Sequence, residues 1–428
     1  MTLQDPASRL RLARHILGRM GETGQPPERG ALEVNIGTDH YLEALRREYL
    51  MPMREMGLNS TFKLVQAPFG GGKTQFLHCL REVAWKEGFV TALVGVSPQE
   101  CPFDDLPRIY QAVARNLELP PAHWEERHDL GIDAVLRAAV ERRLQAHTPE
   151  ELHDWLLREG LRAHIESHAV RRAAVLFMQA VLDRRPEQEE LLADFLRGDR
   201  VVEAELREFG VREILEPATA FRFLCSIVQM LRFLDFPGVV MLFDEMDRVM
   251  SLTVRRRRAI GDNLRQMIDY CGSSTLPAVM WVYAVPPEFL ISVVPEYPAL
   301  EQRLRGAAHF APESPVAPIV DLDTLPLGAT ELLRRIGYRL IELYCEAWPE
   351  QNLNRAIARE NIDALAQELG EHMLEAGARR TFVKAAVRLL TTQGRGEQHV
   401  LTPEEIATAA GTAAPGPQPP MGGEEVFR

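Results

Sequence analysis

Short apolar runs alternate with amphipathic segments through the middle of the chain. The runs most suited to buried strands are Thr61–Gln66, Phe89–Val96, Val239–Phe243 and Ala278–Val285, with Pro318–Leu322 as a fifth candidate. Apolar positions at helical spacing lie between them, as in Gln75–Trp85 and Asp104–Leu117. Strands that alternate with helices in this way predict an α/β core built on a parallel sheet.

Two long blocks show only helical periodicity. Residues 118–217 are rich in Leu, Ala, Arg and Glu, and Thr148 followed by Pro149 is a typical helix start. Because this block lies between the second and third strands, we interpret it as a large helical insertion into the core. Residues 326–395 are helical again and predict a C-terminal lid.

These patterns predict four parts. They are an N-terminal helical segment (1–40), the α/β core with its insertion (41–325), the lid (326–395) and a tail (396–428). From Thr402 onward the tail is rich in Ala, Pro and Gly, a composition that buries too little apolar surface to fold. The tail is therefore expected to be disordered, and removal of residues 402–428 is expected to leave the melting temperature unchanged.

Composition narrows the class of protein. The 428 residues carry 61 acidic and 49 basic side chains, a formal charge of -12, so any contact with DNA should be local or shared with a partner. The five cysteines are scattered without a CxxC pair, which is typical of reduced thiols. No signal peptide and no apolar run of the roughly 20 residues that a membrane helix needs is visible. We expect a cytoplasmic protein with no membrane contact.

The loop after the first strand carries the strongest chemical signal. Residues 67–74 have the sequence APFGGGKT between a strand and a helix, which is the context of a phosphate-binding P-loop. Glycine amides and the helix N-terminus would surround the phosphates of ATP, with Lys73 against the β- and γ-phosphates. Ala67 departs from the pattern, which has Gly there. The predicted nucleotide-binding residues are Phe69, Gly70, Gly71, Gly72, Lys73, Thr74 and Gln75.

The third strand ends in two carboxylates, Asp244 and Glu245. Downstream of a P-loop, this pair predicts that Asp244 and the Thr74 hydroxyl hold Mg²⁺ and that Glu245 activates the attacking water as general base. The fourth strand, in contrast, ends at Val285 without a polar group to sense the γ-phosphate. Tyr283 is a candidate substitute, and this departure leaves the rate of hydrolysis open.

Several arginines are candidates for supporting roles. Arg303 and Arg305 follow the fourth strand, where ring ATPases place an arginine that acts on a neighbouring subunit, and this position predicts a homo-oligomer. Arg380, in the lid, is placed to reach the γ-phosphate. Each of them is alternatively a surface charge. The run Arg255–Arg258 would contact a nucleic-acid backbone or the acidic face of a partner, or it would form a solvated helix face, which is the more common use.

Five stretches together point to a family: FKLVQAPFGGGKTQFL, TALVGVSPQECPFDDLPRIYQAV, VVMLFDEMD, YPALEQRLRG and GARRTFVKAAVRLL. Over most of residues 10–395 the chain resembles the ATP-binding proteins of bacterial BREX phage-defence systems, in particular the BrxD-like ones. The resemblance implies an AAA+ ATPase related to the origin-recognition initiators, with the Walker lysine at Lys73 and the acidic pair at Asp244 and Glu245. It also implies action on or near DNA with other phage-defence proteins.

The sequence therefore supports two functions. The first is a P-loop AAA+ ATPase, with a parallel sheet, a helical insertion and a helical lid, that hydrolyses ATP with Mg²⁺. The second is a nucleotide-gated scaffold that binds ATP, hydrolyses little of it and recruits defence partners. The intact Lys73 and Glu245 favour the first, and the apolar end of the fourth strand favours the second.

Overall fold

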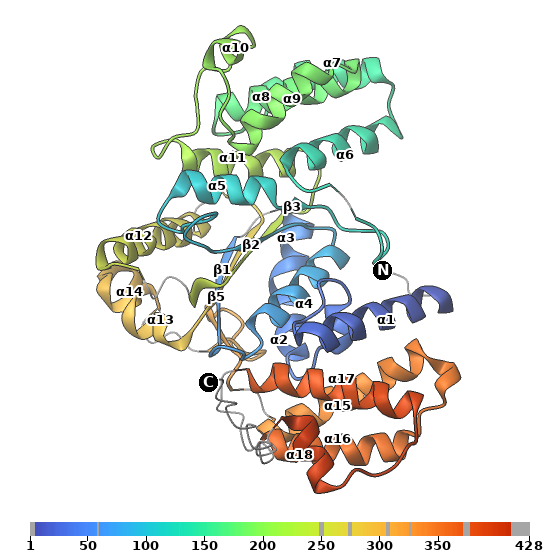
Figure 1. The fold of residues 1–428 in the computed structure, drawn as a ribbon. Coiled ribbons are helices and arrows are strands. Elements are labelled where there is room, and N and C mark those ends of the chain that lie inside the picture. The colour runs from blue at the N-terminus through green and yellow to red at the C-terminus, as the bar shows by residue number, and fades with distance from the viewer. Residues whose placement is uncertain are drawn as a thin grey trace, which may run out of the picture. The chain divides into compact units, whose positions relative to one another are not determined.

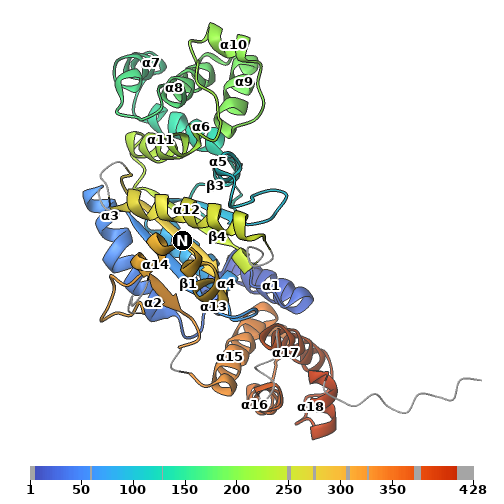
Figure 2. The same cartoon turned by 90° about the vertical axis from the view of Figure 1, so that its left-hand side faces the viewer.

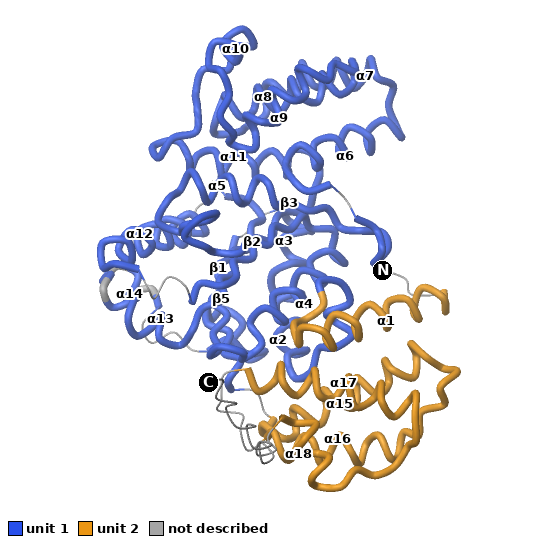
Figure 3. Tube along the Cα trace, viewed as in Figure 1, with its two compact units in different colours: residues 1–2, 28–325 blue, residues 3–27, 326–428 orange. Residues whose placement is uncertain are grey.

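The computed structural model describes residues 5–57, 60–127, 129–247, 252–272, 276–304, 309–324, 327–370 and 377–411. Its contacts divide the chain into two compact units, shown in Figure 3. The first unit holds residues 28–325, and the second holds residues 3–27 together with 326–428. The predicted segment 1–40 is thus not one piece, because it is divided between the two units near residue 27.

A six-stranded sheet forms the centre of the first unit (Figure 1). Its strands are β1 (Thr61–Gln66), β2 (Val90–Gly95), β3 (Leu117–Glu118), β4 (Val239–Asp244), β5 (Val279–Val285) and β6 (Ile319–Asp321). Their order across the sheet is β3-β2-β4-β5-β1-β6, and all neighbours are parallel except the edge pair β2 and β3. All five predicted strands are present, and the two-residue β3 is an addition.

Helices and short helical turns precede β1 or connect these strands. Outside the insertion they are η1 (Ala31–Val34), α2 (Asp39–Leu45), η2 (Arg46–Leu50), α3 (Met51–Met56), α4 (Lys73–Lys86), α5 (Leu106–Arg115), α11 (Ala220–Phe233), α12 (Val254–Cys271), α13 (Pro287–Ser292), η5 (Val294–Glu296) and α14 (Pro298–Leu304). Two clusters of buried apolar side chains lie among the strands and helices, and every residue of β5 is buried. Complete burial explains why β5 is a continuous apolar run rather than an alternating one.

The helical insertion lies between β3 and β4. It contains α6 (Ile132–Leu144), α7 (Pro149–Arg158), η3 (Gly160–Arg162), α8 (His168–Asp183), α9 (Pro186–Arg197) and α10 (Glu203–Glu208). Figures 1 and 2 both show these helices gathered at one end of the sheet-containing unit. The predicted start of α7 is confirmed, because Thr148 and Glu151 form a complete capping box.

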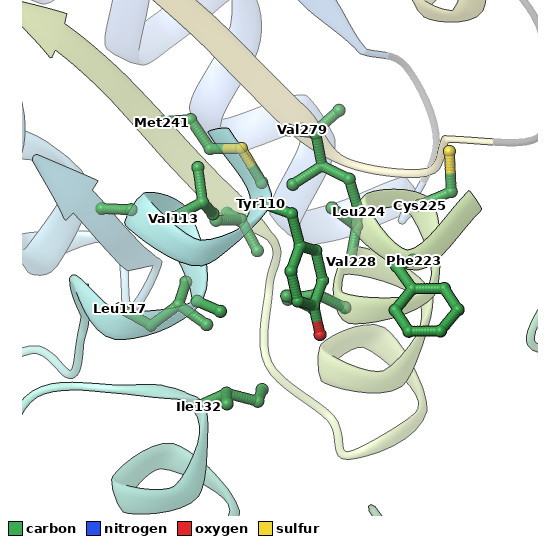
Figure 4. Close-up of a cluster of buried hydrophobic side chains, with 14 of the residues drawn as sticks. Tyr110, Val113, Leu117, Ile132, Phe223, Leu224, Cys225, Val228, Met241 and Val279 are labelled. Atoms are coloured by element: carbon green, nitrogen blue, oxygen red, sulfur yellow. The ribbon is translucent and has the colours of Figure 1, made fainter. Parts of the chain in front are cut away.

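Helices α5 and α11 connect the insertion to the sheet. Figure 4 shows Tyr110 of α5 among Phe223 and Val228 of α11, with Met241 of β4 close by. The Tyr110 and Phe223 ring centroids are 5.7 Å apart, and the Tyr110 hydroxyl donates a hydrogen bond of 2.6 Å to the Leu196 carbonyl of α9. The apolar cluster is therefore continuous from the strands into the insertion.

The second unit is helical. It consists of α1 (Pro6–Thr23), α15 (Ala329–Ala347), η6 (Pro349–Gln351), α16 (Arg355–Gly370), α17 (Ala378–Arg395) and α18 (Pro403–Ala410). The apolar face of α1, with Leu12, Ile16 and Leu17 buried, packs on α15 and α17. This burial explains why residues before 28 belong with the C-terminal helices. In the described parts of the chain, no helix is long and apolar enough to cross a membrane.

The predicted disordered tail is wrong for residues 403–410, which form α18. Thr402 and Glu405 make a capping box at its start, and Ile406 and Ala410 are buried where α18 packs on α16 and α17. The local helix-start signal therefore outweighs the Ala-rich composition. Residues 412–428 lie outside the described ranges.

Because α18 packs on α16 and α17, removal of residues 402–428 should lower the melting temperature and not leave it unchanged. Point substitutions in α18 test this packing directly. Ile406→Asp places a charge at a side chain that is only 4% exposed, and should lower the free energy of unfolding by about 3 kcal/mol. Thr408→Asp, at an exposed position of the same helix, should cost less than about 1 kcal/mol. Urea unfolding of both variants measures the difference, and equal stabilities would show that α18 does not pack as described.

Candidate nucleotide-binding site

The P-loop connects β1 to α4, as the sequence predicts. Gly72 adopts a left-handed conformation, with φ of 98°, directly before the first residue of α4. A Cβ added to Gly71 would lie 2.7 Å from the Ala67 Cβ, so Gly71 makes room for the alanine that replaces the usual glycine. The loop thus has the backbone freedom and the absence of side chains that let amides approach a phosphate closely. The loop is therefore suited to bind the phosphates of a nucleoside triphosphate.

Lys73 joins this loop to the acidic segment. Its ammonium donates hydrogen bonds to the carbonyls of Ala67 (2.8 Å) and Pro68 (3.2 Å), and it lies 3.4 Å from the Asp247 carboxylate. Lys73 itself is only 6% exposed. Burial raises the pKa of Asp247, Lys73 opposes that rise, and the nearby charges of Asp244 and Glu288 add to it. The sequence analysis assigned no role to Asp247.

The acidic pair lies where β4 ends. Asp244 is in register with Gly95 of the neighbouring β2, and its Oδ1 accepts a hydrogen bond of 2.8 Å from the Glu245 amide. Glu245 has a φ of 61°, a left-handed conformation that costs a non-glycine residue about 1 kcal/mol. Its carboxylate lies beside Gly95, since a Cβ added there would be 3.9 Å from Glu245 Oε2. The turn exposes Glu245 at the carboxyl edge of the sheet.

The end of β5 carries no polar side chain. Val285 is paired with Gln66 at the end of β1, and both lie at the edge where the P-loop begins. Tyr283 is fully buried, stacks on Phe243 with ring centroids 4.8 Å apart, and bonds through its hydroxyl to the Met267 sulfur. The hypothesis that Tyr283 senses the γ-phosphate is therefore wrong. Its side chain is part of the apolar cluster that α12 covers.

A segment that sequence reasoning missed is attached to the P-loop helix. The Glu82 carboxylate of α4 accepts hydrogen bonds from the amides of Ala31 (2.9 Å) and Leu32 (3.2 Å) in η1, and burial raises the pKa of Glu82. Gln75 donates through its side-chain amide to the Ala31 carbonyl at 2.8 Å. The Gln75 side chain is thus engaged by η1, although the sequence placed it with the nucleotide-binding residues. No sequence motif marks this long-range contact.

Comparison with known proteins gives the family. Residues 10–401 match the profile of the family described as "BREX system ATP-binding protein BrxC/D". The chain belongs to this family. Among the solved structures, the Aeropyrum pernix ORC2 protein in its ADP form is similar over 92% of this chain and 72% of that chain, with 13% identity and a TM-score of 0.44. No curated protein matches the chain.

Membership of the BrxC/D family confirms the predicted ATP-binding phage-defence class. The topology agrees with the predicted AAA+ fold. The P-loop strand β1 and the acidic strand β4 lie on either side of β5, and the carboxyl ends of all three strands meet at one edge. Ligands bind at this edge in open α/β sheets. The helical insertion and the C-terminal helices of the predicted α/β architecture are also present.

The candidate arginines of this BrxC/D-family chain differ in what surrounds them. Arg303 belongs to α14, which is anchored by the buried Leu300 and Leu304, whereas Arg305 and the Arg303 side chain lie outside the described residues. Arg380 lies in the first turn of α17 in the other unit, half-buried, and its role stays a prediction. Its carbonyl lies against Gly24 at the end of α1, where an added Cβ would be 2.7 Å away.

The run Arg255–Arg258 at the start of α12 is partly structural. Arg256 makes two hydrogen bonds of 2.8 Å to the Asp104 carboxylate, and Arg257 donates to the Leu252 carbonyl at 3.0 Å. Arg255 and Arg258 are exposed. Two of the four arginines are therefore engaged in positioning α12 and its flanking segments, and two face solvent.

Proposed function

We propose that this BREX-family protein hydrolyses the ATP it binds. The observation that carries the proposal is the approach of Lys73 to Asp247, which brings the P-loop and the acidic segment together at the carboxyl edge of the sheet. Lys73 and the loop amides would bind the phosphates, while the Thr74 hydroxyl and Asp244 would hold Mg²⁺. The ion would neutralise phosphate charge. Glu245, exposed and next in the chain, would accept the proton of the attacking water.

ATP binding would have to replace the present partners of Lys73. Its hydrogen bonds go to two carbonyls of its own loop, and its nearest opposite charge is Asp247. Phosphate oxygens carry more negative charge than carbonyls and would replace them as acceptors. The carboxylate of Asp247 would compete with the nucleotide for the same ammonium group.

Lys73→Ala should weaken ATP binding at least about 100-fold, because charge-assisted hydrogen bonds to the phosphates are lost. Asp247→Asn is the matched control: it keeps the side-chain size, removes the competing charge, and should bind ATP as well as the wild type or better. Titration of both with a fluorescent ATP analogue measures the effect, and melting temperatures verify folding. Wild-type affinity in Lys73→Ala would rule out this loop as the triphosphate site.

We further propose that the protein forms a homo-oligomer and acts on or near DNA with other phage-defence proteins. The exposed Arg255 and Arg258 of α12 support a local contact with a phosphate backbone, in a chain whose overall charge is -12. Mass determination with ATP, with ADP and without nucleotide, each with and without duplex DNA, tests assembly and DNA binding together. A monomer that ignores DNA in every condition would contradict both.

The second candidate function is a scaffold that binds ATP with little hydrolysis. The apolar end of β5 favours it, because Val285 offers no hydrogen bond and Tyr283 is buried. Phosphate release separates the two functions. Multiple turnovers, with or without duplex DNA, support the ATPase, whereas tight ATP binding with no turnover in either condition supports the scaffold.

A further inference from the structure

A cavity of about 500 Å³ lies in the helical insertion. Its walls come from the start of α8, the loop after α10 and the first turn of α11, and they include no residue of the P-loop or the acidic segment. The charged lining residues are Arg171, Arg172, Arg212, Arg222, Glu166 and Glu213. Four positive and two negative charges leave a formal +2 with histidine neutral, in a chain of -12. Such a local excess attracts anions.

Hydrogen bonds hold the walls of the cavity in place. Ser167, the N-cap of α8, donates through its hydroxyl to Glu213 at 2.7 Å, and Arg222 forms an ion pair with the same carboxylate. Arg171 donates to the Ala163 carbonyl at 3.0 Å, and Arg172 donates to the Phe209 carbonyl. Glu213 is thus neutralised within the wall, and the two arginines of α8 are oriented before any ligand arrives.

Positive groups in the cavity still have capacity to bind. The Arg222 side chain lines the cavity and is 41% exposed, although its Nε is buried without a hydrogen-bond partner among the described residues. Arg212 lines the cavity and is exposed. In addition, His168 and Ala169 bring the N-terminus of the 16-residue α8 to the cavity, and its dipole favours an anion.

We propose that this cavity binds a phosphate monoester of about nucleotide size. The volume lies within the roughly 300–1,000 Å³ of small-molecule sites. A phosphate monoester carries about -1.5 to -2 at neutral pH, which matches the +2 of the walls better than a singly charged carboxylate or phosphodiester does. Arginines bind its oxygens in paired hydrogen bonds. The Glu166 carboxylate, exposed in the wall, would accept hydrogen bonds from hydroxyl or amino groups of the rest of the ligand.

The proposal is independent of hydrolysis at the P-loop and can be tested without it. Calorimetry with adenosine 5′-monophosphate is performed on the full chain in a Lys73→Ala background, which removes the lysine of the other nucleotide site. Arg212→Ala and Arg222→Ala are each expected to weaken binding about tenfold or more. Arg158→Ala and Arg207→Ala are matched controls. Both arginines are exposed, lie in the same insertion outside the cavity, and form i,i+4 surface ion pairs with Asp154 and Glu203. Their affinities should stay within about twofold of the parent.

Inorganic phosphate should compete with the monophosphate, and a short DNA duplex with only internal phosphodiesters should not. No saturable binding at millimolar monophosphate, or equal affinities in the cavity and control variants, would overturn the proposal. Binding of the duplex alone, lost in the cavity variants, would also overturn it in favour of a nucleic-acid surface. If Arg222→Ala fails to fold because Glu213 loses its ion-pair partner, the substitution Arg212→Ala at an exposed position decides the outcome.

Discussion

Glu245→Gln should bind ATP as tightly as the wild type and hydrolyse it about 10³-fold more slowly, within the range that a general base contributes. The amide has the size of the carboxylate and accepts no proton at neutral pH. The left-handed backbone at this position is equally accessible to glutamine, so the fold should be unchanged. ATP affinity should survive because Lys73 and the loop amides are untouched. Single-turnover phosphate release, with affinity measured separately, isolates the chemical step.

Two further variants show whether the effect belongs to this carboxylate. Glu245→Asp keeps the charge and withdraws it by one methylene, so its rate should fall between those of the wild type and Glu245→Gln. Glu288→Gln removes another carboxylate whose charge acts on Asp247, at an exposed position in α13, and should change the rate only a few-fold. If Glu245→Gln turns over normally, or if Glu288→Gln is equally slow, Glu245 is not the base.

The conformation of Glu245 connects the fold with this proposed role. A left-handed glutamate is unfavourable by itself, and residues held in such conformations cluster at functional sites. Here the Asp244 carboxylate accepts the Glu245 amide hydrogen and thereby stabilises the turn. The Asp244 side chain thus stabilises the backbone conformation from which the Glu245 side chain projects. No sequence pattern shows this relation, because DE at the end of a strand is compatible with several backbone paths.

Local signals explain most of what the sequence predicted. The P-loop and the strands β1, β4 and β5 were placed within one or two residues, since glycine requirements and apolar runs act over short distances. The start of α7 was recognised for the same reason. The Thr402–Glu405 capping box was equally readable, but the surrounding composition outweighed it in the prediction.

Long-range packing explains most of what was missed. The grouping of α1 with α15 and α17 depends on contacts across more than 300 residues, and the hold of Glu82 on η1 is a side-chain contact to backbone amides. Tyr283 was misplaced because alternate residues of a strand point to opposite faces, and the sequence of a fully buried strand does not reveal which face is which. Charge patterns had the same ambiguity: the four arginines of α12 look alike in sequence, yet Arg256 is engaged with Asp104.

Arg303 and Arg305 are candidates for a role in an active site shared between two subunits. We propose that Arg303 or Arg305 reaches the ATP of an adjacent subunit, so the double variant Arg303→Ala/Arg305→Ala should lose about 10³-fold in rate and keep nucleotide binding. The reason is their place after β5 in the sequence: Arg303 belongs to α14, which the buried Leu300 and Leu304 fix to the core, and Arg305 follows that helix along the chain.

Mixing subunits provides the decisive measurement. A subunit with the Arg303→Ala/Arg305→Ala substitutions binds ATP but lacks the arginine that would reach a neighbour's ATP. A Lys73→Ala subunit keeps that arginine but binds ATP poorly. Each variant alone should be inactive, and their mixture should recover part of the activity because some interfaces combine an intact P-loop with an intact finger. The control mixes Lys73→Ala subunits with Glu245→Gln/Arg303→Ala/Arg305→Ala subunits. No interface in this mixture combines Lys73 and Glu245 of one subunit with the arginine of its neighbour, so no activity should return. Normal hydrolysis by the double-arginine variant alone, or wild-type activity per subunit that stays constant on dilution, would show that each subunit works by itself.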